Sequence, residues 1–254
     1  TVIGQIIAAI LALVFNLKCN RELNISMKGF RPNGYLIVQI YKGGAPSIVV
    51  QAIGSLMTYG MNLILAAFGS AQTVFGIYFK LQSFVFMPVF GLNNGMVPII
   101  AYNYGAGHKD RVIKTIKHSV AYGVGIMFVG LLAMHIFPAQ LMRMFDAEES
   151  LIAIGAPALE TISLSFVFAG FCIVAGSVFQ ALGNGVYSMI VSVARQMCVL
   201  LPVAKLLSLS GEVTLIWWAF PIAELASVLL TSYFLVRIYR KVICHIGEPV
   251  VQDA

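Results

Sequence analysis

The 254-residue sequence is 59% hydrophobic and only 10% charged, and its mean hydropathy is +0.90. Soluble domains carry about 25% charged residues, so this composition excludes an ordinary soluble domain and indicates a polytopic membrane protein. The net charge of +6 does not indicate nucleic-acid binding, because most basic residues fall in short segments between apolar runs.

Seven apolar runs follow one another along the chain. Most are close to the roughly 20 residues that a helix needs to cross a ~30 Å hydrocarbon core. The sequence therefore predicts an all-α membrane protein, a polytopic bundle of six complete transmembrane helices and one partial N-terminal helix. The predicted spans are residues 2–17, 43–68, 71–104, 120–137, 152–182, 186–209 and 213–236.

The first run is short for a complete span, and the sequence begins inside it. We expect residues 1–17 to be part of a helix whose beginning lies outside this sequence. A polar connector at residues 18–42 would follow, then six spans within residues 43–241 and a tail at residues 242–254.

Charge alternates between the connectors. Those after the first, third and seventh runs are basic, whereas those after the second, fourth and sixth are acidic or nearly uncharged. Because basic loops stay in the cytoplasm, we expect residues 18–42, residues 105–117 and the C-terminus to be cytoplasmic. The expected location is the plasma membrane (the inner membrane of a bacterium).

The third run contains an interruption. Its central sequence is FVFMPVFGLNNGMVPII, in which Pro88 and Pro98 flank two glycines and the pair Asn93–Asn94. Proline removes a backbone donor and clashes with the preceding turn. We therefore expect a broken helix near residues 88–98, of the kind with which secondary transporters build midplane binding sites. The alternative is a kinked structural helix, since Pro and Gly are common in membrane spans.

Polar residues recur at helical spacing on four of the runs. On a single run such a stripe is typical of hydrogen bonds between helices, but four stripes in one bundle predict a shared polar cavity. The stripes are Gln51, Ser55, Thr58 and Asn62; Ser177, Gln180 and Asn184; Ser188, Ser192 and Arg195; and Glu224, Ser227 and Thr231.

Three charged residues fall deep inside the runs. Lys80, Arg195 and Glu224 each lie about 10 residues, or ~15 Å, from the start of their run, which predicts positions near the midplane. Intramembrane charges face cavities or partners. Glu224 would either form a structural pair with Lys80 or Arg195, or act as a coupling residue that exchanges a proton or cation.

The predicted substrate and ion cavity draws on these stripes, charges and asparagines. Its candidate residues are Gln51, Ser55, Thr58, Asn62, Lys80, Asn93, Asn94, Gln180, Arg195 and Glu224. The four cysteines are far apart with no CxxC pair, so we expect buried thiols and no metal site. The sequence contains no nucleophile–base pair of the kind that would indicate an enzyme.

Three stretches together resemble the MATE (multidrug and toxic compound extrusion) family. They are GGAPSIVVQ from residue 43, FVFMPVFGLNNGMVPIIAYNYGAGHKDRV from residue 84, and AGSVFQALGN from residue 175. The resemblance implies a twelve-helix exporter with two lobes around a central cavity. By this resemblance, residues 43–241 are the six-helix C-terminal lobe and residues 1–17 are the partial last helix of an N-terminal lobe that lies outside this sequence. It also implies antiport of amphipathic, cationic compounds against H⁺ or Na⁺, with no cofactor besides the coupling ion. The implied partners are small-molecule substrates, the lipid bilayer and the N-terminal lobe.

The sequence departs from the family at one point. Some members use acidic residues in the first and fourth helices of this lobe for the coupling cation, where this chain has Gln51 and mostly Phe166 and Phe168. Coupling would then fall to the other lobe or to Glu224. The alternative function is export of lipid-linked sugars or polysaccharides by a related fold, which a basic cavity would favour.

Overall fold

The computed structural model of the chain describes residues 2–19, 31 and 33–247. Within these residues the secondary structure is helical and contains no strand, which confirms the predicted all-α class. The chain divides into two compact units, Thr1–Lys42 and Gly43–Ala254.

The first unit holds α1 (Val2–Cys19) and the first turns of α2 (Gly34–Leu65). At the start of α2, Asn33 Oδ1 accepts a 3.0 Å hydrogen bond from the backbone N–H of Tyr35. Such a side-chain acceptor satisfies an N–H that the helix itself leaves unpaired. Part of the predicted connector at residues 18–42 is thus helical, while much of the rest, like most of the predicted tail, lies outside the described residues.

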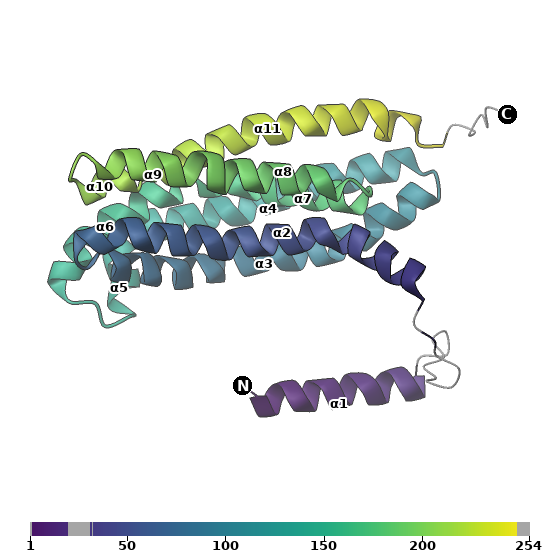
Figure 1. The fold of residues 1–254 in the computed structure, drawn as a ribbon, viewed down its shortest axis with the longest axis horizontal. Helices are drawn as coiled ribbons and strands as arrows, with labels where there is room; N and C mark the ends of the chain where they lie inside the picture. The colour runs from purple at the N-terminus through teal and green to yellow at the C-terminus, as the bar shows by residue number, and fades with distance from the viewer. Residues whose placement is uncertain (1, 20–30, 32, 248–254) are drawn as a thin grey trace. The chain divides into compact units, whose positions relative to one another are not determined.

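The second unit is a helical bundle, and Figure 1 shows its long helices lying lengthwise side by side with the connections at the two ends. It begins with the rest of α2. The elements that follow are η1 (Ala66–Phe68), α3 (Ala71–Gly105), α4 (Lys109–Ile136), α5 (Pro138–Arg143), α6 (Glu149–Ser163), α7 (Phe166–Ala181), α8 (Gly185–Val193), η2 (Ala194–Leu200), α9 (Leu201–Ser208), α10 (Val213–Ile216), α11 (Ala219–Lys241) and η3 (Ile243–His245).

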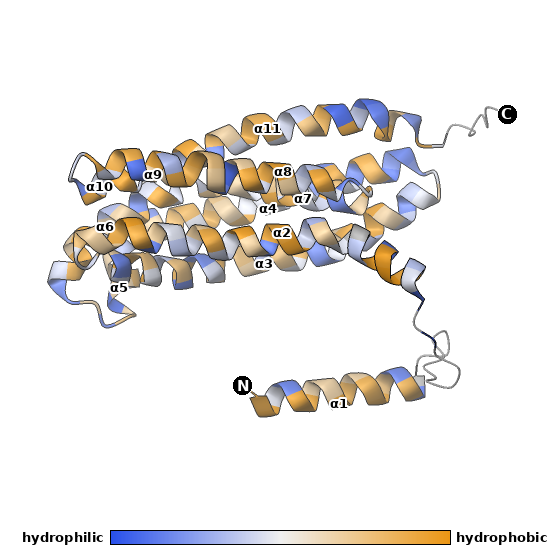
Figure 2. Ribbon diagram, in the orientation of Figure 1, coloured by the Kyte–Doolittle hydropathy of each residue, from blue (hydrophilic) through white to orange (hydrophobic). Residues whose placement is uncertain are grey.

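These elements supply the expected spans. Among the described residues, five helical stretches are long and apolar enough to cross a membrane, or six if the bent pair α6 and α7 is one span. Figure 2 shows apolar residues along the lengths of the helices and hydrophilic ones gathered toward ends such as that of α11. This distribution is that of a polytopic membrane bundle.

The predicted break near residues 88–98 is wrong. Helix α3 runs without interruption from Ala71 to Gly105, with Pro88 and Pro98 inside it. The helix packs against α4 and α7 and buries Val89, Asn93 and Met96 toward them at helical spacing. Membrane helices tolerate proline where neighbouring helices hold the backbone in place, so this packing keeps the segment helical.

The irregular backbone lies instead in the fifth and sixth spans. The fifth span, predicted as one helix, is bent by 49° between α6 and α7. At the bend the hydroxyls of Ser163 and Ser165 donate to the carbonyls of Glu160 and Ile162. Ser and Thr that bond back to the preceding turn commonly bend helices, so the serine pair accounts for the bend better than Pro157 within α6.

Glycines let α4 lie close to its two neighbours. A Cβ on Gly123 would come 2.7 Å from Cγ2 of Val174 on α7, and a Cβ on Gly130 would clash with the side chain of Val85 on α3. Helices that approach closely through small residues gain van der Waals contact, the main driving force for association in lipid. The glycines of α4 therefore hold the centre of the bundle together.

Candidate functional site

The candidate site is a buried ion pair between the sixth and seventh spans. Arg195 Nη1 donates to Glu224 Oε1 at 2.6 Å, and the side chains are 25% and 10% exposed. Glu224 is the one buried acidic side chain among the residues that the structure describes. Because each charge alone is costly at this depth, the pair lowers the cost of burying both.

A widened turn carries Arg195. The segment η2 is a π-helix, and the N–H of Leu201 bonds to the carbonyl of Gln196, five residues earlier. Pro202 follows directly; it has no N–H, and its ring would clash with the carbonyl four residues before it in a regular helix. The wider π turn directly before Pro202 thus avoids this clash. Single π turns often occur at functional sites.

Polar side chains continue from the pair along α11. Ser227 and Thr231 follow Glu224 on one face, and their hydroxyls donate to Sγ of Cys172 on α7 at 3.4 and 3.6 Å. All three partners are buried. The predicted stripe on the seventh span therefore faces the interior and joins α11 to α7.

Aromatic rings cover the other side of the pair. Phe220 lies one turn before Glu224 and packs against Tyr78 and Phe75 of α3, at ring distances of 5.7 and 6.2 Å. These rings are at most 9% exposed and keep water from that side. The second carboxylate oxygen, Glu224 Oε2, is buried and has no hydrogen-bond partner. It is the atom on which a proton or cation could be held.

The candidate residues of α2 either form hydrogen bonds within their own helix or are exposed. On α2, Thr58 donates to the carbonyl of Gly54 and Asn62 to that of Thr58, while Gln51 and Ser55 are exposed. These hydrogen bonds stay within α2 and run from a side chain to the carbonyl four residues earlier, which is the common local pattern for such residues in helices.

The remaining candidates are scattered. Gln180 donates to Ser188 at 3.2 Å, Asn93 is buried with its Oδ1 unpartnered, and Asn94 is exposed. In the described part of the chain, the Arg195–Glu224 ion pair is the one side-chain contact between two of the ten predicted cavity residues. The shared polar cavity formed by these ten residues stays a prediction.

Lys80 does not reach Glu224. Its ammonium lies 5.6 Å from the centre of the Phe145 ring, and its side chain is exposed. Helix α3 has 35 residues, about 52 Å at ~1.5 Å per residue, and Lys80 lies on the side of it that faces the segment around Phe145 and not α11.

Three features of the site were not predicted from the sequence. Cys172 was expected only as a buried thiol, yet it accepts hydrogen bonds from two hydroxyls of α11. Tyr78, on the aromatic side of the site, carries no sequence signal that separates it from other buried aromatics. For the π turn, the proline at 202 after an intramembrane arginine was the available clue.

Comparison with known proteins places the chain among transporters. The MatE family model matches residues 46–206. Multidrug export protein MepA of Staphylococcus aureus (strain MSSA476) is 27% identical over 226 residues, which make up 88% of this chain and 49% of MepA.

Solved structures show the same relationship. The MATE multidrug transporter DinF-BH is 31% identical with a TM-score of 0.81, over 95% of this chain and 54% of DinF-BH. A MOP superfamily transporter from Pyrococcus furiosus shares the fold at 19% identity and a TM-score of 0.80, over 94% of this chain and 54% of its own. The chain thus spans about half the length of the relatives that it matches.

Proposed function

This chain belongs to the MATE family of multidrug efflux transporters, and on that premise we propose that it exports amphipathic, cationic compounds by secondary active antiport against H⁺ or Na⁺. It is an integral membrane protein. The proposed location is the plasma membrane with the C-terminus in the cytoplasm, supported by the basic residues that end α11 and follow α3. The proposed partner of the six-helix unit is a second lobe, since the relatives are about twice as long.

The observation that carries the proposal is the buried Arg195–Glu224 pair. A coupled exporter needs a group that binds the coupling cation with different affinity in its two conformations. When the coupling cation binds Glu224, Arg195 loses its counter-charge, and an unpaired buried charge costs several kcal/mol. Cation binding therefore destabilises the conformation described here and drives the change to the other.

The rival function, export of lipid-linked sugars, would need a basic cavity. Arg195 is neutralised by Glu224, and Lys80 lies against Phe145. Arg195 and Lys80 therefore do not form one basic cavity together, and the multidrug function is favoured.

Replacing Glu224 tests the coupling role. Glu224→Gln keeps the size and hydrogen bonding of the side chain and removes its charge. We expect the variant to bind a fluorescent cationic dye, yet to lose dye efflux driven by a pH or Na⁺ gradient. The matched control is Glu160→Gln, at the other acid within a predicted span, which is half-buried and should keep its efflux. Normal efflux by Glu224→Gln with unchanged gradient dependence would exclude Glu224 from coupling.

A further inference from the structure

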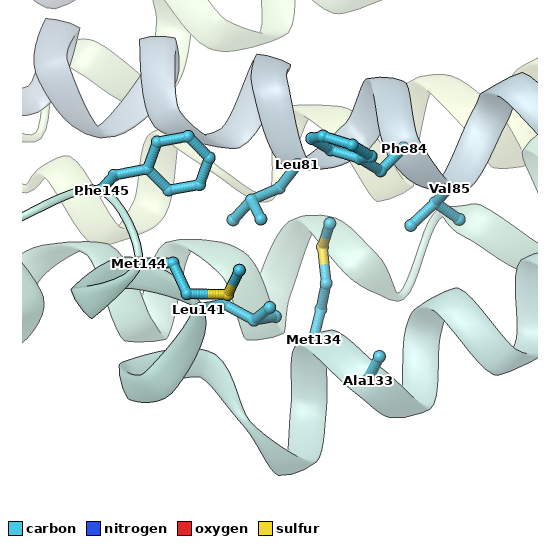
Figure 3. Close-up of a pocket in the computed structure, with 8 residues that line it drawn as sticks. All are labelled: Leu81, Phe84, Val85, Ala133, Met134, Leu141, Met144 and Phe145. Atoms are coloured by element: carbon cyan, nitrogen blue, oxygen red, sulfur yellow. The ribbon is translucent and has the colours of Figure 1, made fainter.

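A small apolar pocket lies on the second unit between α3, α4, α5 and the turn that follows α5, and the residues of the ion pair do not line it. Its volume is about 200 Å³, and Figure 3 shows its lining side chains converging from these segments. All are apolar: Leu81, Phe84, Val85, Ala133, Met134, Leu141, Met144 and Phe145. Phe84 and Met144 are 73% and 75% exposed, so the pocket opens on the surface of the unit.

A cation stands beside this pocket. Lys80 lies one turn before Phe84 on the same face of α3, and its ammonium is 5.6 Å from the centre of the Phe145 ring in the pocket wall. Within residues 2–19, 31 and 33–247, the ion pairs are Arg143–Glu149 and Arg195–Glu224. Lys80 thus has no carboxylate partner in the described structure.

The depth of the pocket follows from the helix ends. Ala133 and Met134 belong to the last turn of α4, which ends at Ile136, and they line the pocket together with Leu81. Lys80, next to Leu81, is therefore level with the last turn of α4. The apolar pocket and the ammonium lie next to each other, as the acyl chain and the phosphate of a lipid do.

We propose that this pocket binds an acyl chain of an anionic glycerophospholipid, whose phosphate is the counter-charge of Lys80. The charge complementarity and the fully apolar lining point to this occupant. A transported drug fits less well, because pockets for such molecules measure about 300–1,000 Å³ and carry a few polar groups. The acyl chain would hold α5 against α3 and α4, and the phosphate would pair with Lys80, which takes no part in the Arg195–Glu224 ion pair.

Photo-crosslinking tests the proposal. The full chain is placed in nanodiscs of phosphatidylcholine with a trace of phosphatidylglycerol that carries a diazirine in its acyl chain, and labelled peptides are identified by mass spectrometry. We expect labelling at the pocket, for example at Met144. Lys80→Gln should lower it about fivefold, the effect of one basic residue near an anionic lipid. Lys205→Gln, an exposed lysine on α9, should not.

A second pair of variants tests the pocket itself. Ala133→Phe fills it and should abolish labelling by the photoreactive phosphatidylglycerol, whereas Ala121→Phe, at an exposed position of the same helix, should leave labelling intact. Equal labelling of Lys80→Gln and wild type would overturn the proposal even if Ala133→Phe did not fold. Unchanged labelling of Ala133→Phe, or preferential labelling of the pocket by a photoreactive cationic dye, would overturn it too.

Discussion

Arg195 and Glu224 set the chemistry of this molecule at the scale of single residues. Each would be costly alone at its depth, and the 2.6 Å contact between them makes both tolerable. The oxygen Glu224 Oε2 has no hydrogen-bond partner, so Glu224 can hold Arg195 through Oε1 and still bind a proton or cation through Oε2. One residue can serve both roles, since an ion pair that opens when a cation binds stabilises one conformation only.

A double-mutant cycle measures the strength of the pair. Arg195→Gln leaves a buried carboxylate without its cation, so we expect a loss of about 3–5 kcal/mol, seen as a lower midpoint of unfolding in detergent. Arg195→Gln with Glu224→Gln should recover most of that loss. The hydroxyl variant Thr231→Val serves as a control on the same face and should cost only about 1 kcal/mol.

Additive effects of the two glutamine substitutions would contradict a direct interaction. In that case the arginine and the glutamate would each be held by other groups, and the coupling role proposed for Glu224 would lose its counter-charge.

At the scale of elements, the position of a glycine on α4 decides its effect. Gly123 faces Val174 of α7, whereas a Cβ on Gly125 would meet nothing within 4 Å. We expect Gly125→Ala to be neutral or to stabilise α4 by up to about 1 kcal/mol, because alanine is the better helix former. Gly123→Ala should lower the unfolding midpoint, because it forces α4 and α7 apart.

The rescue variant identifies the cause. Adding Val174→Ala to Gly123→Ala removes the methyl group that the new Cβ would meet at 2.7 Å, so stability should return. Failure to rescue would mean that Gly123 is required for its backbone and not for the helix contact.

For the whole molecule, the connections at the two ends of the bundle predict which side faces the cytoplasm. Asp110 and Gln140 are exposed near opposite ends of α4. In a variant whose own cysteines are replaced, Gln140→Cys should react with a membrane-impermeant maleimide added to intact cells, and Asp110→Cys should react only after lysis. The opposite pattern would overturn the orientation inferred from the basic loops.

The sequence by itself determined the class, the number of spans and most of their ends. These follow from local hydropathy, because a bilayer requires each crossing segment to be apolar and helical on its own account. It also showed that Arg195 and Glu224 lie inside spans, and the motifs at residues 43, 84 and 175 indicated the family.

Only the tertiary structure decided which groups meet. Lys80 and Arg195 were equal candidates for Glu224. The packing of η2 on α11 brings Arg195 to Glu224, whereas Lys80 lies against Phe145. The continuity of α3 through Pro88, the bend at Ser163–Ser165 and the pocket beside Lys80 likewise depend on contacts between helices. Hydropathy along one chain carries no information on such contacts, because a helix face gains its partner only when a neighbouring helix packs against it.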